Sequence, residues 1–554
     1  MKVAQAVGAA LTDLGVDAVF GVVGSGNFHV TNALVAGGAR FVAARHEGGA
    51  ATMADAYARV SGKVGVLCVH QGPGLTNALT GITEAAKSRT PLLVLAADVG
   101  AGAVRSNFRI DQAALAGAVG AVPARIHSAQ SALADVVRAH RTAVAERRTV
   151  LLSMPLDVQA AGYPGPVTVT EPRLPPPPVP VRQAVVQFAD MLGAARRPVF
   201  LAGRGARLSG AGDALRALAE RTGALLATSA VARGLFRGDP FDLDVSGGFA
   251  SPVAAELIGG ADLLVGWGCA LNMWTLRHGN LVGADTTVIQ VDLDSEALGA
   301  HQPIELGLVG DVAGTARSVE AVLAHREFSA PGYRSPGLAE RLAREVRWRD
   351  VPYDDDSGKD PSGDARIDPR TLSIALNDML PPERTVAVDS GNFMGYPAMY
   401  LDVPDADGLV FTQAFQSIGL GLATAIGAAV ARPDRLTVAA LGDGGALMGV
   451  AELETAVRLG LGLLVVVYDD EAYGAEVHHF GPDGHPLDTV TFPAADIAEI
   501  GRGFGCAAVT VRRAEDLAAV ADWLDGPRDR PFVVDAKVTA ERPAWWLEEA
   551  FRGH

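Results

Sequence analysis

Short runs of branched apolar residues alternate with helical patterns along most of this sequence, and no other feature limits the fold as strongly. Examples are RPVFLAG (197–203), DLLVGWG (262–268) and LLVVVYDD (463–470), which have the length and composition of buried strands. A buried strand that is followed by a helix and then by another buried strand is the repeating unit of a parallel sheet. We therefore predict an α/β fold made of βαβ units.

Two segments divide the chain into domains. At 554 residues the chain is too long for a single hydrophobic core. The proline-rich segment EPRLPPPPVPVRQ (171–183) cannot sustain a helix, and residues 326–366 are polar and rich in turn residues. With these segments as linkers, we predict three doubly wound parallel-sheet domains. Their ranges are residues 1–165, 183–325 and 366–554.

The composition narrows the classes of function. The net charge is −16 and no basic block is present, which argues against a nucleic-acid partner. No charge-free stretch reaches the roughly 18 residues of a membrane span, and Asp13 and Asp17 interrupt the apolar core that a signal peptide needs. Cys68, Cys269 and Cys506 form neither a disulfide framework nor a zinc pattern, so we expect a cytoplasmic protein.

Two acidic clusters follow consecutive strands of the third domain. LTVAALGDGG (436–445) contains Asp443, and after a helical stretch the next strand ends in an acid pair that includes Asp470. Both clusters would leave the carboxyl edge of one sheet, where α/β proteins bind ligands. Carboxylates there suit Mg²⁺ or Ca²⁺, and Gly444 and Gly445 let backbone N–H groups approach a phosphate. Two acidic turns without a metal are the alternative.

The succession of GDG, helix and branched strand with a terminal acid pair resembles the thiamine-diphosphate motif of the pyruvate decarboxylase, acetolactate synthase and benzoylformate decarboxylase superfamily. The resemblance implies that Asp443, Asp470 and the backbone carbonyl of Ala472 hold Mg²⁺, which bridges the cofactor diphosphate. That family usually carries Asn-Asn where this chain has Asp469 and Asp470. The extra negative charge beside the diphosphate leaves the metal affinity and preference open.

The same resemblance extends to the other cofactor contacts. Ile418 stands where a large apolar residue forces thiamine diphosphate into its V conformation, and the backbone carbonyl of Gln416 stands where the 4′-amino group finds its acceptor. DSGNF (389–393) resembles the loop that touches the diphosphate. Together with Glu47, the implied cofactor-binding residues are Gly391, Asn392, Gln416, Ile418, Gly442, Asp443, Gly444, Gly445, Asp470, Ala472, Tyr473 and Gly474.

Glu47 lies at a strand-to-helix junction in RHEGGAATMADAYAR (45–59). By itself it is an acidic residue that the helix dipole favours. The segment resembles the first domain of the same family, which implies that the Glu47 carboxyl group hydrogen-bonds N1′ of the aminopyrimidine. A protonated, partly desolvated glutamate there shifts the pyrimidine toward the imino tautomer that deprotonates C2 of the cofactor.

Two loops of the first domain resemble the loops around the substrate in this family. His70 in VHQGPGLTNAL (69–79) is placed as in benzoylformate decarboxylase, where an imidazole serves substrate binding and proton transfer. FGVVGSGNFH (20–29) resembles the loop after the first strand. The implied substrate-pocket residues are Ser25, Gly26, His70, Gln71 and Glu476.

The segment YGAEVHHF (473–480) follows the metal loop. Glu476 matches the position of an active-site glutamate of pyruvate decarboxylase, and His479 falls where acetolactate synthases carry a substrate-pocket tryptophan. An exposed polar helix turn is the alternative for this segment. The implied catalytic residues are Glu47, His70, Glu476 and His479.

The resemblance implies an enzyme that decarboxylates a 2-oxo acid with thiamine diphosphate and Mg²⁺. We rank an acetolactate synthase-like carboligase first, in which the resulting enamine is coupled to an acceptor aldehyde or ketone, because DVGAGAVRSNFRIDQ (98–112) lacks the His-His pair of pyruvate decarboxylase. A benzoylformate decarboxylase-like enzyme that releases an aldehyde is the alternative. A flavin-using oxidase and a non-catalytic cofactor-binding subunit are further alternatives, and retention of Glu47 argues against the latter.

The resemblance also bears on assembly and on a second cofactor. In this family the first domain of one subunit and the third domain of another enclose the cofactor, which implies a homodimer or homotetramer. GRGARLSGAG (203–212) follows a strand of the middle domain, but its spacing is not GxGxxG, and an ordinary tight turn is preferred. Whether the middle domain binds FAD is left open.

Overall fold

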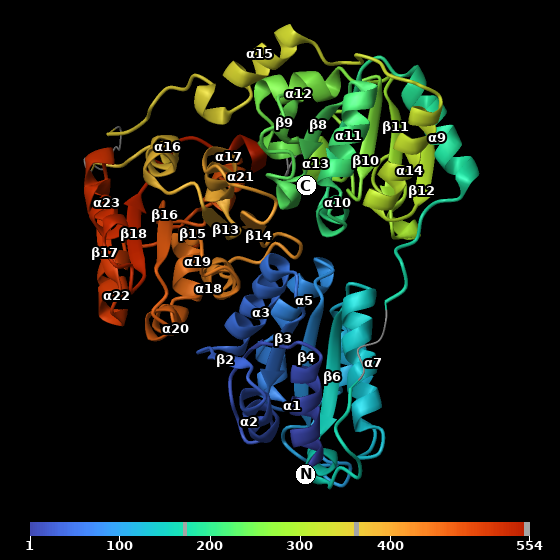
Figure 1. The fold of residues 1–554 in the computed structure, drawn as a ribbon. Helices are drawn as coiled ribbons and strands as arrows, with labels where there is room; N and C mark the ends of the chain where they lie inside the picture. Colours follow the sequence, from blue (N-terminus) through green and yellow to red (C-terminus); the bar gives the residue numbers. More distant parts are fainter. Residues whose placement is uncertain (170–173, 359–364, 548–554) are drawn as a thin grey trace.

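The computed structural model describes residues 1–169, 174–358 and 365–547 of the chain (Figure 1). It contains three six-stranded sheets whose strands pair in parallel. The predicted α/β fold with three doubly wound sheets is therefore confirmed. Parts of both predicted linkers, residues 171–173 and 359–364, lie outside the described residues, as does the tail 548–554.

The first sheet has the strand order β2-β1-β3-β4-β6-β5. The order changes direction between β1 and β3, so the carboxyl ends of these strands flank the crevice in which such sheets bind ligands. The strands are β1 (Ala18–Gly21), β2 (Arg40–Ala43), β3 (Gly65–Val69), β4 (Leu92–Asp98), β5 (Val122–Arg125) and β6 (Thr149–Pro155). The helices are α1 (Val3–Asp13), α2 (Phe28–Ala36), α3 (Glu47–Ser61), α4 (Pro73–Asn77), α5 (Leu79–Lys87), α6 (Gln112–Ala118), α7 (Ala132–Ala145) and α8 (Leu156–Ala160).

The second sheet has the order β12-β11-β10-β7-β8-β9, with its change of direction between β7 and β10. The strands are β7 (Pro198–Ala202), β8 (Leu225–Thr228), β9 (Asp242–Val245), β10 (Leu263–Trp267), β11 (Thr287–Asp292) and β12 (Leu306–Val309). The helices are α9 (Arg182–Ala194), α10 (Arg204–Leu208), α11 (Gly212–Thr222), α12 (Pro252–Gly259), α13 (Met273–Leu276) and α14 (Val312–His325).

The third sheet, β14-β13-β15-β16-β18-β17, repeats the order of the first sheet strand for strand. Its change of direction lies between β13 and β15. The strands are β13 (Arg384–Val388), β14 (Leu409–Phe411), β15 (Leu436–Gly442), β16 (Leu463–Asp469), β17 (Ala507–Val511) and β18 (Phe532–Lys537). The helices are α16 (Pro369–Met379), α17 (Gly395–Tyr400), α18 (Gly421–Ala431), α19 (Asp443–Met448), α20 (Glu452–Arg458), α21 (Gly474–Phe480), α22 (Ile497–Phe504) and α23 (Ala518–Asp525).

Capping residues explain where two helices begin. Asp368 caps α16 by accepting the N–H of Arg370, and Pro369 takes the first helical position, where no N–H is needed. The second predicted linker contains a helix that its polar composition concealed, α15 (Pro336–Glu345). The Ser335 side chain caps it in the same way.

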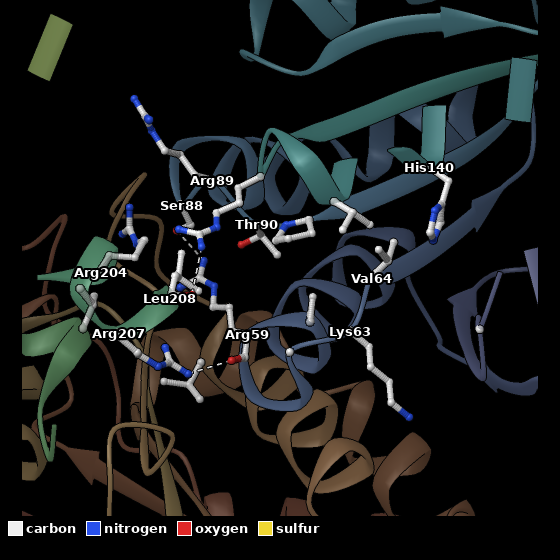
Figure 2. Close-up of a pocket in the computed structure, with 18 of the residues that line it drawn as sticks. Arg59, Lys63, Val64, Ser88, Arg89, Thr90, His140, Arg204, Arg207 and Leu208 are labelled. Atoms are coloured by element: carbon white, nitrogen blue, oxygen red, sulfur yellow. Dashed lines mark hydrogen bonds between the residues drawn. The ribbon is translucent and has the colours of Figure 1, made fainter. Parts of the chain in front are cut away.

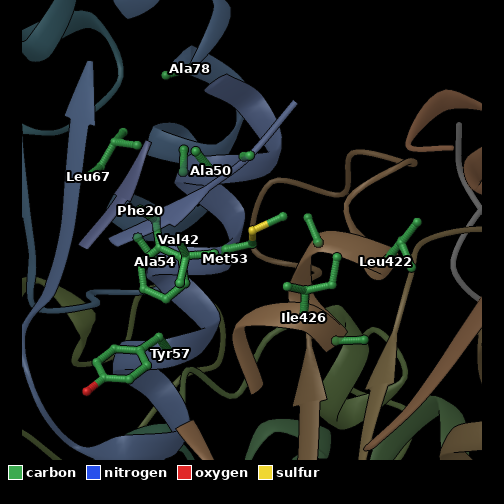
Figure 3. Packing of buried hydrophobic residues seen from close by; sticks show 14 of the residues in the cluster. Phe20, Val42, Ala50, Met53, Ala54, Tyr57, Leu67, Ala78, Leu422 and Ile426 are labelled. Atoms are coloured by element: carbon green, nitrogen blue, oxygen red, sulfur yellow. The ribbon is translucent and has the colours of Figure 1, made fainter. Parts of the chain in front are cut away.

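Helix α3 of the first domain packs along α18 of the third domain (Figure 3). Met53 on α3 and Leu422 and Ile426 on α18 belong to one buried cluster, which also includes strand residues of both sheets. A Cβ at Gly427 would lie 2.2 Å from the carbonyl oxygen of Met53, so this close approach requires glycine. The first and third domains therefore share a continuous core.

Arg59, near the carboxyl end of α3, connects all three domains (Figure 2). Its guanidinium forms ion pairs with Asp55 and Glu84 and donates to the carbonyl oxygen of Phe411 in the third domain at 3.2 Å. Arg207 of the second domain donates to the carbonyl oxygen of Arg59 at 2.7 Å. Arg59, Arg207 and Phe411 line a cavity of about 420 Å³ at the junction of the domains.

Candidate active site

Aspartates follow three adjacent strands at the carboxyl edge of the third sheet. Asp389 follows β13, Asp443 follows β15, and Asp470 directly follows β16. Gly442 on β15 pairs with Tyr468 on β16, so the chain leaves both strands at the same level. Asp443 and Asp470 therefore follow neighbouring strands at the same sheet edge, as the sequence predicted.

Asp470 lies close enough to Asp443 to disfavour its charge. Burial raises the pKa of both carboxyl groups, and the negative neighbours Asp469 and Asp470 raise the pKa of Asp443 further. The backbone N–H of Ala472 opposes this effect at Asp470. A cation beside them would favour the ionised form of both carboxyl groups.

Asp469 has its own cationic partner and does not need one in the site. Its side chain forms a buried ion pair with Lys537, the last residue of β18. Its other oxygen accepts the N–H of Glu471 at 3.0 Å. The two adjacent acids of this strand end are therefore treated differently, since Asp469 is neutralised by lysine and Asp470 faces Asp443.

The residues around Asp470 fit a hard cation. A Cβ at Gly474 would lie 2.3 Å from Oδ2 of Asp470 and 3.1 Å from Nδ2 of Asn392, so only glycine leaves this space free. Oδ1 of Asn392 is buried and has no hydrogen-bond partner among the residues that the structure describes. Within the described residues no group of three or more His, Cys, Asp or Glu side chains could hold a metal ion. The predicted metal ligands do not form such a group, because they are two carboxylates and the main-chain carbonyl of Ala472. Oxygen ligands of this kind suit Mg²⁺.

The loop that carries Gln416 and Ile418 is held in place by Asp389. This buried carboxylate accepts the N–H groups of Gly419 and Leu420 at 3.0 and 3.2 Å, and burial raises its pKa to about 6. Gln416 adopts φ 62°, a conformation that non-glycine residues adopt at an energetic cost and that often marks functional loops. The structure thus places the predicted cofactor-contact loop beside the predicted metal loop, since a Cβ at Gly419 would touch Met448 of α19.

Glu47 is the first residue of α3, directly after the turn that follows β2. Its Oε2 accepts the side-chain N–H of Asn77 at 3.0 Å. A Cβ at Gly74 would lie 3.5 Å from Oε1 of Glu47 and 3.2 Å from Cβ of His70, so both side chains border the same turn. The structure brings these two predicted catalytic residues together.

His70 follows β3 at the switch point of the first sheet. Gly26, in the loop after β1, donates its N–H to Nδ1 of His70 at 3.1 Å. Burial lowers the pKa of His70, while the charge of Glu47 opposes this shift. The Gln71 side chain is buried against Gly26, and Ser25 beside it is exposed. The four predicted pocket residues of the first domain therefore share one sheet edge.

Glu476 and His479 lie on α21, at the edge of the third sheet rather than of the first. Glu476 is exposed, and the His479 ring packs edge-on against Phe480 at 4.6 Å between centroids.

Sequence reasoning missed three residues that shape the two edges, Asp389, Glu452 and Lys537. Only Asp389 and Lys537 carry a local signal, because each is a charged residue at the end of an apolar strand.

Comparisons with known proteins agree with this architecture. Family models described as thiamine pyrophosphate enzyme, N-terminal TPP binding domain, central domain and C-terminal TPP binding domain match residues 1–117, 185–319 and 389–536. The probable 2-ketoarginine decarboxylase AruI of Pseudomonas aeruginosa is 33% identical over 93% of this chain and 89% of its own length. The acetolactate synthase isozyme 2 large subunit of Escherichia coli is 27% identical over 99% and 97%. The sulfoacetaldehyde acetyltransferase of Rhodobacter capsulatus is 28% identical over 97% and 93%.

Among residues 1–169, 174–358 and 365–547, no helix has both the length and the apolar character that crossing a membrane requires.

Domain order, sheet topology and similarity over nearly the whole chain lead to one assignment. The chain belongs to the thiamine pyrophosphate enzyme family and is a thiamine-diphosphate-dependent enzyme that cleaves and forms carbon–carbon bonds.

Proposed function

We propose that this enzyme decarboxylates a 2-oxo acid and releases an aldehyde. The observation that carries the proposal is the orientation of His70. Because Gly26 donates to Nδ1, the neutral ring keeps its proton on Nε2. Burial lowers the pKa of His70, so the ring is neutral near pH 7 and presents an N–H at that atom, through which a solvent proton can be relayed. Similarity to a protein named as a probable decarboxylase supports the same choice.

When bound, thiamine diphosphate supplies the carbon that attacks the 2-oxo group and stabilises the charge left by CO₂. In this proposal Asp443, Asp470 and the carbonyl of Ala472 hold Mg²⁺ against the diphosphate. Glu47 holds a proton at N1′ of the pyrimidine. His70 would relay one solvent proton through Nε2 to the carbon that has lost CO₂, with the ring neutral before and after. A second proton would leave the substrate oxygen as the aldehyde departs. Ser25, Gly26, Gln71, Glu476 and His479 complete the pocket.

The test uses purified protein with Mg²⁺ and thiamine diphosphate. CO₂ and aldehyde are measured by mass spectrometry over a panel of 2-oxo acids that includes side chains with a guanidinium group, because one relative is named for such a substrate. His70→Ala is expected to lower kcat by about 10²–10⁴-fold, as for loss of a positioned acid. His29→Ala, in an exposed position of the same domain, is the control. An unchanged kcat in His70→Ala, or no CO₂ from any substrate, would refute the proposal.

Carboligation is the second candidate. The sequence alone ranked it first, and relatives named acetolactate synthase and sulfoacetaldehyde acetyltransferase cover nearly the whole chain. The orientation of His70 and the 33% identity to the probable decarboxylase support ranking decarboxylation first. Adding an acceptor aldehyde to the assay decides between them, because a coupled product at the expense of free aldehyde favours ligation. A non-catalytic subunit would give neither product.

We also propose a homodimer or dimer of dimers in which the edge of the first sheet covers the edge of the third sheet in another subunit. Both edges expose large apolar side chains, Phe28 and Phe108 on the first and Met448 and Phe480 on the third, at 41–62% exposure. Mixing the inactive variants Glu47→Gln and Asp443→Ala should then restore activity, because a hybrid dimer contains one intact site. No recovery in confirmed hybrids would refute shared sites.

The second sheet has a cleft of about 860 Å³ at the carboxyl ends of β7, β8, β10 and β11. Its lining includes Arg204, Asn272 and Asp292. This volume is ample for a dinucleotide, and the absorbance spectrum of the purified protein decides whether FAD occupies it.

The three cysteines are free and buried, which supports the proposed cytoplasmic location.

A further inference from the structure

The turn that leads into Glu47 is held by the third domain of the same chain. Glu452, the first residue of α20, is only 3% exposed. Its Oε1 accepts the backbone N–H groups of Arg45 and His46 at 3.1 and 3.0 Å. A Cβ at Gly49 would lie 2.5 Å from the same oxygen, so glycine is what lets the carboxylate enter the turn.

Neighbouring contacts orient this carboxylate. The hydroxyl of Thr455 donates to Oε2 of Glu452 at 2.6 Å. The next acid along the helix, Glu454, pairs with the side chain of Arg45 and does not replace Glu452 at the backbone. Arg458 at the end of α20 donates to the carbonyl oxygen of Ala43. Helix α20 thus binds residues 43–46. Within this helix, Glu452 is the residue that accepts hydrogen bonds from the backbone N–H groups of Arg45 and His46.

These contacts are made at the amino-terminal end of α3, beside the His46 side chain that caps Gly48 and the Asn77 side chain that donates to Glu47. The middle of α3 is fixed by packing on α18, and its carboxyl end by the Arg59 network. The N–H groups of Arg45 and His46 precede the helix and have no intrahelical acceptors. A charged acceptor makes stronger hydrogen bonds than a neutral one. Glu452 therefore helps to fix the position of the first helical residue, Glu47.

We propose that Glu452 is a positioning residue that sets where the Glu47 carboxyl group meets the pyrimidine of thiamine diphosphate. The proposal rests on the role proposed for Glu47. Glu452 also follows α19 after only three residues, and α19 begins with Asp443. One short stretch of the third domain, residues 443–458, therefore positions both a metal ligand and the activating glutamate of the first domain.

The first test measures the turn itself, without metal, cofactor or substrate. Amide hydrogen exchange at Arg45 and His46 is compared in wild type, Glu452→Ala and the matched control Glu454→Ala, whose side chain contacts Arg45 but no N–H group of the turn. Glu452→Ala should accelerate exchange at these two amides by about tenfold or more, which corresponds to about 1.4 kcal/mol. The control should stay near the wild-type rate. Unchanged exchange in Glu452→Ala would overturn the proposal.

The second test measures cofactor activation without needing the substrate. The rate of proton exchange at C2 of bound thiamine diphosphate should fall by about 10–100-fold in Glu452→Ala, because small misplacements of a catalytic group have effects of this size. Glu452→Gln keeps one acceptor oxygen and should lose less. Cofactor affinity should stay within about threefold, since a positioning role acts on activation and not on binding.

The remaining outcomes separate this proposal from the one on which it rests. A slow rate in Glu47→Gln together with a wild-type rate in Glu452→Ala would refute the positioning role and leave the activating role of Glu47 intact. A wild-type rate in Glu47→Gln would refute both. If Glu452→Ala fails to fold, Glu452→Gln decides alone, and a wild-type rate at both amides and at C2 in that folded variant would overturn the proposal.

Discussion

Replacing Lys537 with methionine is expected to destabilise the protein by about 3–5 kcal/mol, because it leaves a buried carboxylate without its partner. The side chains of Lys537 and Asp469 are only 5% and 2% exposed. Lys537 also lies 3.1 Å from Asp535 and donates to the carbonyl oxygen of Ala495 at 2.9 Å. Methionine has nearly the same length, so the loss comes from the charge and its hydrogen bonds and not from a cavity.

Thermal unfolding of the metal-free protein measures this loss. At about 2–4 °C per kcal/mol for a domain of this size, the midpoint should fall by roughly 6–20 °C. Lys63→Met is the control, because it removes an ion pair with Asp17 whose side chains are 54% and 48% exposed and should cost less than about 1 kcal/mol. Adding Asp469→Asn to Lys537→Met should recover part of the loss. A midpoint for Lys537→Met within about 2 °C of wild type would refute the reasoning.

Asp470→Asn should retain binding of Mg²⁺ and thiamine diphosphate within about tenfold by titration calorimetry, because an amide oxygen still coordinates the ion; complete loss would show that the charge is required. Met53→Ala should lower the free energy of unfolding by about 2–5 kcal/mol in urea, because Met53 is fully buried against α18; an unchanged midpoint would contradict that packing. Burial raises the pKa of Asp443 and Asp470, so the metal-free fold binds more protons than the unfolded chain, and its stability falls as the pH rises from about 4 toward neutral. Mg²⁺ removes this penalty, so the increase in unfolding midpoint on adding Mg²⁺ and cofactor should be larger at about pH 8 than at about pH 5.5; equal increases would refute the assignment.

The sequence predicts the three sheets and the two acidic strand ends because both depend on local patterns. Branched apolar runs indicate buried strands at any position in a chain, and consecutive strands of a βαβ unit end at the same edge. Asp443 and Asp470 could therefore be placed together from the sequence alone. Glu47 and Ile418 required family resemblance, because a single acid at a helix start or a single apolar residue in a loop has many ordinary explanations.

Contacts between distant segments could not be predicted in this way. Lys537 neutralises Asp469 from a strand 68 residues away, and Glu452 reaches Arg45 across 407 residues. No sequence pattern within either segment indicates which distant residue it contacts, because such pairs depend on how complete domains pack. Helix α15 was missed for a different reason, since its polar, charged composition resembles that of a linker, although Ser335 and Pro336 form a helix start.

The core shared by α3 and α18 has a consequence for chain connectivity. The first and third domains are joined through buried side chains and the Arg59 hydrogen bonds, whereas the polypeptide between them passes through the whole second domain. The linkers then act mainly by keeping the domains at high effective concentration. A chain cut in either linker should reassemble from its fragments, and a gene divided at that point could still encode the same architecture as two polypeptides.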